Sequence, residues 1–456
     1  MSKINLTTNS TFGERFFKKT SLFLLLGWIF LIASLFYSSL FCDSHETTAK
    51  CTSFSQSLLN IFWGITVPLS IFLITLNHHV WRRVCPLAAS SRISEYLKIN
   101  PIHGQPLNKS KAEKFLFKHH LKIQWISLFF GIVLRVTFFN NSPLMLGAYL
   151  AITVLFAFLT GLLFGGKSWC QYLCPMGPVQ SIIAGEEAVA RSYYISPKRK
   201  IGPSACVTID KGKYINTCSS CIKNCIDIDT QNHYWKNLTN KSLRWAALSY
   251  PGLVTGFFAS IILKGYLYTG DGFQYLENGS FLTPAGYSIS ALFFFATFSL
   301  ILVSCIFSYW LMVKIEDFLV QRAHLRQENY KLKYIPNRVR LISSMIAVNL
   351  FFILSPISLI TGEHIETVIQ YVVFALTLLK TSKSWGRSYN HSLRDKSSKL
   401  WVAKNKDINL DSELTDGRQI EELDPQEIYL LKKLFLLKLS YPQKTSNAES
   451  QIGFKR

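Results

Sequence analysis

The chain has 456 residues, of which 49% are hydrophobic and only 17% are charged. Its apolar residues are concentrated in blocks of about twenty, the length that crosses a bilayer. This composition excludes a string of soluble domains and predicts an all-α polytopic membrane protein. The net charge of +22 does not indicate a nucleic-acid-binding protein, because the basic loops contain no nucleic-acid recognition motif.

The apolar blocks predict eight membrane spans. In chain order they cover residues 21–41, 57–80, 123–141, 143–165, 246–268, 286–313, 341–360 and 367–379. The first block lacks a signal-peptide cleavage site, so we expect it to remain as a helix. The resulting organisation is an N-terminal segment 1–20, a four-helix region 21–165, a loop 166–245, a second four-helix region 246–379 and a tail 380–456.

Basic residues fix the expected orientation. Every lysine and arginine except Lys50, Arg135 and Lys264 lies in the two terminal segments or in alternate loops. By the positive-inside rule, both termini are cytoplasmic, and we expect a multi-pass protein of the cell's inner (plasma) membrane. Arg135 either meets a ligand such as a quinone head group or extends to the membrane surface, where Lys264 is also expected to reach.

Seven cysteines face the cytoplasm in this orientation. They are Cys85, Cys170, Cys174, Cys206, Cys218, Cys221 and Cys225. Because the cytosol is reducing, such a group predicts metal binding or redox chemistry rather than disulfides. Cys42 and Cys51 share an outer loop, where they either form a disulfide or remain as thiols, and Cys305 lies inside a span.

The segment "CSSCIKNC", residues 218–225, has the spacing C-x2-C-x3-C. This spacing matches the last three cysteines of the bacterial ferredoxin motif, and Cys206 could supply a further thiolate. A four-thiolate zinc site is the alternative, because it also uses closely spaced cysteine pairs. The loop therefore predicts a small cytoplasmic ferredoxin-like insertion rich in cysteine.

The segment "GKSWCQYLCPMGP", residues 166–178, places Cys170 and Cys174 directly after the fourth span. Together with the ferredoxin-like loop, it resembles the polytopic membrane 4Fe-4S binding proteins of the NapH, NosR and CcoG type. The resemblance implies that Cys85, Cys170 and Cys174 are membrane-edge ligands and that Cys218, Cys221 and Cys225 are ferredoxin ligands. In that group an earlier span also ends in C-x3-C-P, whereas here Trp81 stands at the first cysteine position.

Seven thiolates allow one or two 4Fe-4S clusters, since each cluster normally takes four. Cys206 could complete a set with the ferredoxin cysteines, or Cys225 could join Cys85, Cys170 and Cys174. The histidine pairs His78–His79 and His119–His120 could supply a ligand or bind haem, although helix-end residues without a ligand role explain them more simply.

These patterns predict an iron–sulfur electron-transfer protein, the electron-transfer component of an oxidoreductase. Its donor would be a membrane molecule such as quinol, and its acceptor a partner protein, in a possible membrane complex. The alternatives are a metal-containing assembly or redox-sensing protein and a structural zinc site. Amphipathic surface helices are expected at 314–336 and after Pro425, with a polar linker at 384–423.

Overall fold

The structure is a computed structural model. It describes residues 11–42, 54, 57–97, 111–139, 142–185, 189, 207–210, 213–216, 234–235, 238, 241–273, 291–327, 332, 334–355 and 363–387. The chain divides into two units, and every helix and strand described lies in the unit formed by Met1–Tyr194 and Ile201–Gly386. In the other unit only Arg387 is described.

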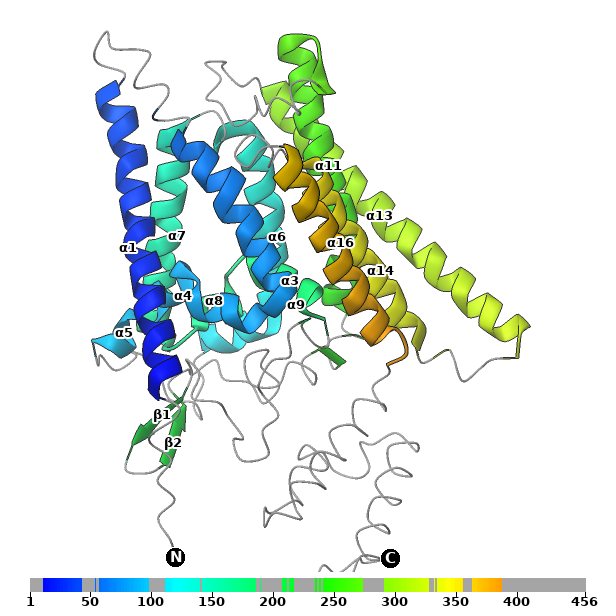
Figure 1. Cartoon of the computed structure of the whole chain (residues 1–456), viewed down its shortest axis with the longest axis horizontal. Helices are drawn as coiled ribbons and strands as arrows, with labels where there is room; N and C mark the ends of the chain where they lie inside the picture. The colour runs from blue at the N-terminus through cyan, green and yellow to red at the C-terminus, as the bar shows by residue number, and fades with distance from the viewer. Residues whose placement is uncertain are drawn as a thin grey trace, which may run out of the picture. The chain divides into compact units, whose positions relative to one another are not determined.

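The N-terminal half contributes four long helical segments and four short helices (Figure 1). The long segments are α1 (Thr11–Cys42), η1 with α3 (Ile61–Thr66 and Val67–Val84), α6 with η2 (Lys111–Leu134 and Arg135–Phe139) and α7 (Pro143–Phe164). The short helices are α4 (Pro86–Ser91), α5 (Ile93–Tyr96), α8 (Ser168–Tyr172) and α9 (Met176–Ala184). Both η segments are π-helical turns.

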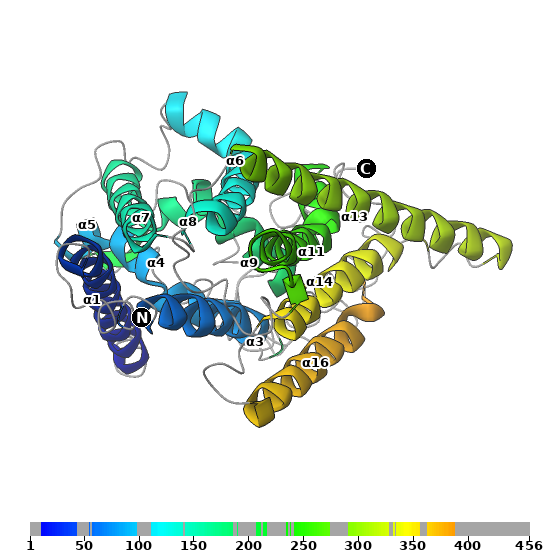
Figure 2. The same ribbon diagram turned by 90° about the horizontal axis from the view of Figure 1, so that it is seen from above.

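The C-terminal half contributes α11 (Lys241–Thr269), α13 (Ala291–Leu325), α14 (Ile335–Leu354) and α16 (Glu363–Trp385). Helix α11 contacts α13 and α14 in its own half and α6 and α9 in the other, and Figure 2 shows it surrounded by them. The short helix α9 contacts α3, α6, α11 and α14. These two helices therefore join the two halves through one hydrophobic core.

Among the residues that the structure describes, eight helical segments are long and apolar enough to cross a membrane, which agrees with the eight predicted spans. Their bounds are Lys19–Leu40, Ser57–Ser91, Lys118–Phe139, Pro143–Phe164, Leu243–Leu267, Ala291–Leu325, Ile335–Leu354 and His364–Trp385. The first part of the surface helix predicted at 314–336 is helical, and it continues α13 without a break to Leu325. The apolar periodicity of that part continues the span that precedes it.

One short hairpin accompanies the helices. Strand β1 (Val207–Asp210) pairs antiparallel with β2 (Lys213–Asn216), with Val207 opposite Asn216. The hairpin falls within the predicted cysteine-rich insertion. The four cysteines of that insertion, the helix expected after Pro425 and most of the polar linker lie outside the described residues. The described structure is thus helical apart from this hairpin, and the ferredoxin-like insertion stays a prediction.

Two glycines allow helices to pack backbone to backbone. A Cβ at Gly161 of α7 would overlap the carbonyl oxygen of Ser91, at the end of α4, and a Cβ at Gly252 of α11 would overlap that of Ser304 in α13. Small residues permit such close approach between membrane helices. The contact at Gly161 sets the distance between the chain segments that carry the membrane-edge cysteines.

Candidate metal centre

Cys85 lies at the break between α3 and α4. Its backbone is extended, with φ −54° and ψ 125°, and Pro86 begins the next helix. Proline disfavours a helical conformation in the preceding residue but is well suited to the first turn of a helix, so the Cys-Pro pair specifies this break. The Cys85 N–H donates to the Trp81 carbonyl at 2.8 Å, which completes the last turn of α3.

Cys170 and Cys174 follow a glycine turn at the end of α7. Gly165 and Gly166 have φ of 76° and 55°, conformations that glycine adopts without steric cost. Cys170 then lies in the short α8, and Cys174 follows it directly before Pro175 and α9. The Cys174 N–H donates to the Trp169 carbonyl at 2.9 Å.

Neighbouring helices hold this turn in place. Gln124 of α6 is buried and donates through Nε2 to the carbonyls of Cys170 and Gln171 at 3.3 and 3.1 Å. Ser91 at the end of α4 donates through Oγ to the Gly166 carbonyl at 2.8 Å. The second bond joins the segment that carries Cys85 to the segment that carries Cys170 and Cys174.

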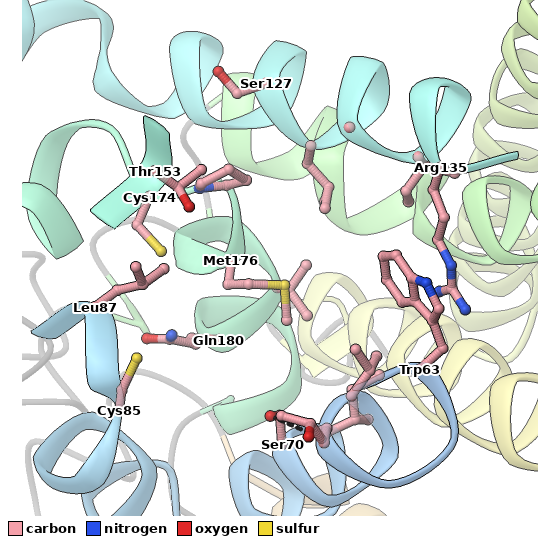
Figure 3. A pocket seen from close by; sticks show the side chains of 18 of the residues that line it. Trp63, Ser70, Cys85, Leu87, Ser127, Arg135, Thr153, Cys174, Met176 and Gln180 are labelled. Atoms are coloured by element: carbon pink, nitrogen blue, oxygen red, sulfur yellow. Dashed lines mark hydrogen bonds between the residues drawn. The ribbon is translucent and has the colours of Figure 1, made fainter. Parts of the chain in front are cut away.

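The three membrane-edge cysteines converge. Cys170 and Cys174 are buried in one cluster with Ala88, Ala157 and Trp169, and Cys85 packs against that cluster. Within the described residues none of the three is in a disulfide, and they lie close enough to interact electrostatically. Figure 3 shows the sulfur atoms of Cys85 and Cys174 directed toward the same space.

Burial governs the electrostatics of these thiols. It raises the pKa of the Cys174 thiol above its ordinary value, and the neighbouring Cys170 and Cys85 raise that pKa further. A thiolate is the form that ligates metal. Three thiolates this close to one another would need a positively charged group between them, and bound iron would supply one.

The donor set fits an iron–sulfur cluster. Within the described ranges, no group of three or more His, Cys, Asp or Glu side chains is arranged to hold a single metal ion. A 4Fe-4S cluster makes a different demand, because its thiolates bind separate iron atoms and stand farther apart. Cys85, Cys170 and Cys174 would provide three of the four ligands.

A cavity of about 260 Å³ extends from the cysteines into the helix bundle. Its walls are mainly apolar and aromatic, and they come from both halves of the chain. Cys85 and Cys174 line it together with Met176, and so do Trp63 and Arg135. In Figure 3 the two cysteines lie at one end of this space, and Trp63 and Arg135 lie at the other.

Arg135 directs its side chain into the protein. Its guanidinium carbon lies 3.9 Å from the centroid of the Trp63 ring and 4.5 Å from that of the Phe257 ring. Such cation–π contacts hold a guanidinium where water is scarce. The Nε atom is buried and has no hydrogen-bond partner in the part of the chain that the structure describes. Of the two predicted roles for Arg135, this position favours contact with a ligand.

The prediction that Lys264 extends to the membrane surface is wrong. Lys264 is only 2% exposed, and its Nζ donates to the Val136 carbonyl at 3.5 Å. Val136 belongs to the π-helical turn η2. We attribute the burial of Lys264 to this turn, because backbone carbonyls freed by irregular helices within a membrane require partners from neighbouring helices.

The other predicted residues divide into two groups. Those outside the described residues are Cys206, Cys218, Cys221 and Cys225, together with Cys51 and the side chain of Cys42. Those described but absent from the described cavity lining are Cys305, His78, His79, His119 and His120. The structure thus brings together three of the seven predicted ligands, and the roles of all seven stay predictions.

Sequence reasoning missed the buried pair formed by Arg82 and Gln180. Arg82 precedes Cys85 by one helical turn, and its Nη1 donates to Gln180 Oε1 at 2.7 Å. The position of Arg82 next to a Cys-Pro element was the available signal. Gln180 gave none, because an isolated glutamine in a short apolar helix has many possible roles.

Comparison with known proteins agrees with this chemistry. Residues 146–201 match a family described as a 4Fe-4S binding domain. The matched region covers most of α7, all of α8 and α9, and both Cys170 and Cys174. No curated protein and no solved structure matches the chain. The match supports an iron–sulfur cluster and suggests an electron-transfer role.

Proposed function

We propose that the chain is a membrane-bound iron–sulfur protein that moves electrons between a membrane donor and a partner protein. The observation that carries this proposal is the convergence of Cys85, Cys170 and Cys174 from two separate chain segments. A cluster bound there would accept and release one electron at a time. The chain would hold it by three buried thiolates and exclude water with the apolar residues around them.

The remaining cysteines complete the proposed ligand set. Cys225 supplies the fourth thiolate of the membrane-edge cluster, while Cys206, Cys218 and Cys221 hold a second cluster with a non-cysteine ligand. The other arrangement keeps Cys206 with the three ferredoxin-like cysteines. In either arrangement, at least one cluster lies beside the ends of membrane helices.

Quinol is the donor that the cavity favours. A lipid-soluble ring can reach a largely apolar space inside a helix bundle, and Arg135 offers buried N–H donors to a ring oxygen. Oxidation of a quinol to a quinone releases two electrons and two protons. The electrons would leave one at a time through the site at Cys85 and Cys174, which line the same cavity, and continue to the partner protein.

The distribution of basic residues supports a location in the inner membrane with both termini cytoplasmic. The eight candidate spans found among the described residues form an even number, which agrees with placing both termini on one side. This orientation puts the cysteine-rich insertion in the reducing cytosol, where a soluble or membrane-bound redox partner can reach it. We also retain the narrower assignment to the NapH, NosR and CcoG type as part of the proposal.

A metal-containing assembly or redox-sensing protein is the second candidate. The resemblance to the CcoG type favours it, since a buried three-thiol site can serve maturation or sensing as well as electron flow. A structural zinc site would use the same thiolates. Zinc without sulfide in the purified protein would remove the electron-transfer proposal and leave the structural alternative.

Anaerobic reconstitution tests the proposed electron flow. Protein in vesicles, with its iron and sulfide content measured first, is mixed with a short-chain quinol and then with a one-electron acceptor. We expect the visible absorbance of the cluster to bleach with quinol and to return with the acceptor. Intact clusters that neither bleach nor recover with any donor and acceptor would contradict electron transfer.

A further inference from the structure

A buried positive charge lies beside the cysteine site. Arg82 is 3% exposed, and its hydrogen-bond partner Gln180 is 4% exposed. Gln180 lines the cavity with Cys85 and Cys174, and Figure 3 shows it at the cysteine end. Arg82 is therefore held close to the site by a side chain from α9, a different helix from its own.

The hydrogen bond to Gln180 fixes the position of the Arg82 guanidinium and adds no opposite charge, because a carboxamide is neutral. Among the described residues that line the cavity, none is Asp or Glu. Arg82 lies near enough to Cys85 and Cys174 to interact electrostatically with both. Because Arg82 and Gln180 are buried, solvent screens this interaction less than it would screen a surface charge.

We infer that Arg82, positioned by Gln180, raises the reduction potential of the cluster held by Cys85, Cys170 and Cys174. This inference rests on the proposed function. Reduction adds one electron and hence one negative charge to the cluster, and a nearby buried cation stabilises the more negative state. Arg82 thus tunes the potential without contacting the cluster, and Gln180 is the residue that positions it.

Arg83 provides a matched control within the same helix. It carries the same charge at the next position, but its guanidinium lies over the Phe17 ring, at 5.2 Å from the centroid. Arg83 is only partly buried and is not among the described residues lining the cavity. A general effect of removing one arginine would appear equally in Arg82→Gln and Arg83→Gln.

The experiment is an EPR-monitored redox titration of the full-length protein. The membrane-edge cluster is identified as the signal that disappears in Cys174→Ser. In Arg82→Gln we expect this cluster to become harder to reduce by on the order of tenfold in its equilibrium constant, or about 59 mV for one electron. Arg82→Lys should retain most of the wild-type potential, and Arg83→Gln nearly all of it.

Gln180→Met is the second variant, because it leaves Arg82 in place and adds no charge but removes the hydrogen bond that holds the guanidinium. The potential should fall in the same direction as in Arg82→Gln but by less, and this measurement tests the inference if Arg82→Gln protein loses its cluster. Unchanged potential in Gln180→Met, or equal shifts in Arg82→Gln and Arg83→Gln, would overturn the inference. Wild-type protein without iron and sulfide would instead refute the proposed function itself.

Discussion

The two Cys-Pro turns of this protein share a backbone design and differ in chemistry. In each turn a cysteine precedes a proline near the start of a helix, and its N–H donates to a tryptophan carbonyl. The pairs are Cys85 with Trp81 and Cys174 with Trp169. The second turn carries an additional thiol, Cys170, four residues before its proline-linked cysteine, whereas the first has Trp81 at the corresponding place.

The two Cys-Pro turns therefore have similar backbones but contribute different side chains to the site. The second turn contributes two thiols to the cysteine cluster, while the first contributes Cys85 and an indole ring that lines the cavity. Trp81, which stands where the second turn has a cysteine, therefore lines the cavity and offers no thiolate ligand. The membrane-edge site is left with three thiols, which is why we assign its fourth ligand to another part of the chain.

The largest expected effect comes from forcing the two turns apart. Gly161→Ala places a methyl group against the Ser91 carbonyl, and overpacking of this kind costs about 1–3 kcal/mol or more. We expect a clearly lower thermal unfolding midpoint in detergent, accompanied by loss of bound iron. Gly27→Ala is the control, because a Cβ there has no atom within 4 Å. Equal stability of the two variants would contradict the close packing of α4 and α7.

An intermediate effect is expected at the far end of the cavity. Arg135→Met keeps an unbranched aliphatic stem but removes the positive charge and the hydrogen-bond donors. A charge-assisted hydrogen bond contributes roughly 1.5–3 kcal/mol, so we expect cluster reduction by quinol to slow by about ten- to hundredfold. Reduction by dithionite should be unchanged.

The control for this change is Arg338→Met. Arg338 is partly buried near the start of α14, where its Nε donates to the Trp385 carbonyl and its guanidinium lies over the Trp385 ring, and it is not among the described cavity-lining residues. Stopped-flow absorbance measures both rates. Arg135→Met protein that quinol reduces as fast as the wild type would remove the cavity from the electron path.

The smallest effect is expected from making the first turn resemble the second. Trp81→Cys creates C-x3-C-P at residues 81–86 and offers a further thiolate to the site. We expect iron to be lost to a chelator a few times more slowly than in Trp81→Ser, which has the same reduced volume but no thiol. Equal rates of iron loss, followed by absorbance, would show that position 81 does not face the site.

The arrangement of spans could be predicted because the bilayer imposes a length and composition on every crossing helix. The grouping of Cys85, Cys170 and Cys174 as membrane-edge ligands was implied by the resemblance to membrane 4Fe-4S binding proteins, and both Cys-Pro elements were expected at helix ends on the same side. These inferences need only local motifs and the orientation set by basic residues. They did not require knowledge of which helices pack together.

The features that could not be predicted from the sequence depend on which helices pack together. Lys264 is buried because the turn at Val136 offers it a carbonyl, and no local pattern marks a π-helical turn. The cavity needs walls from α3, α6, α9 and α11 at once, so Trp63 and Arg135 looked unrelated in sequence. The pair Arg82–Gln180 joins residues 98 positions apart, a contact that only the folded chain reveals.

The central claim is that Cys85, Cys170 and Cys174 hold an iron–sulfur cluster. The most direct test compares iron, acid-labile sulfide and EPR signals of anaerobically purified wild type, Cys174→Ser and Cys305→Ser. Cys305 is an equally buried cysteine in α13. We predict that only Cys174→Ser loses the iron, sulfide and signal of one cluster. Wild-type protein that contains zinc without sulfide, or Cys174→Ser protein with its full iron and sulfide content, would contradict the claim.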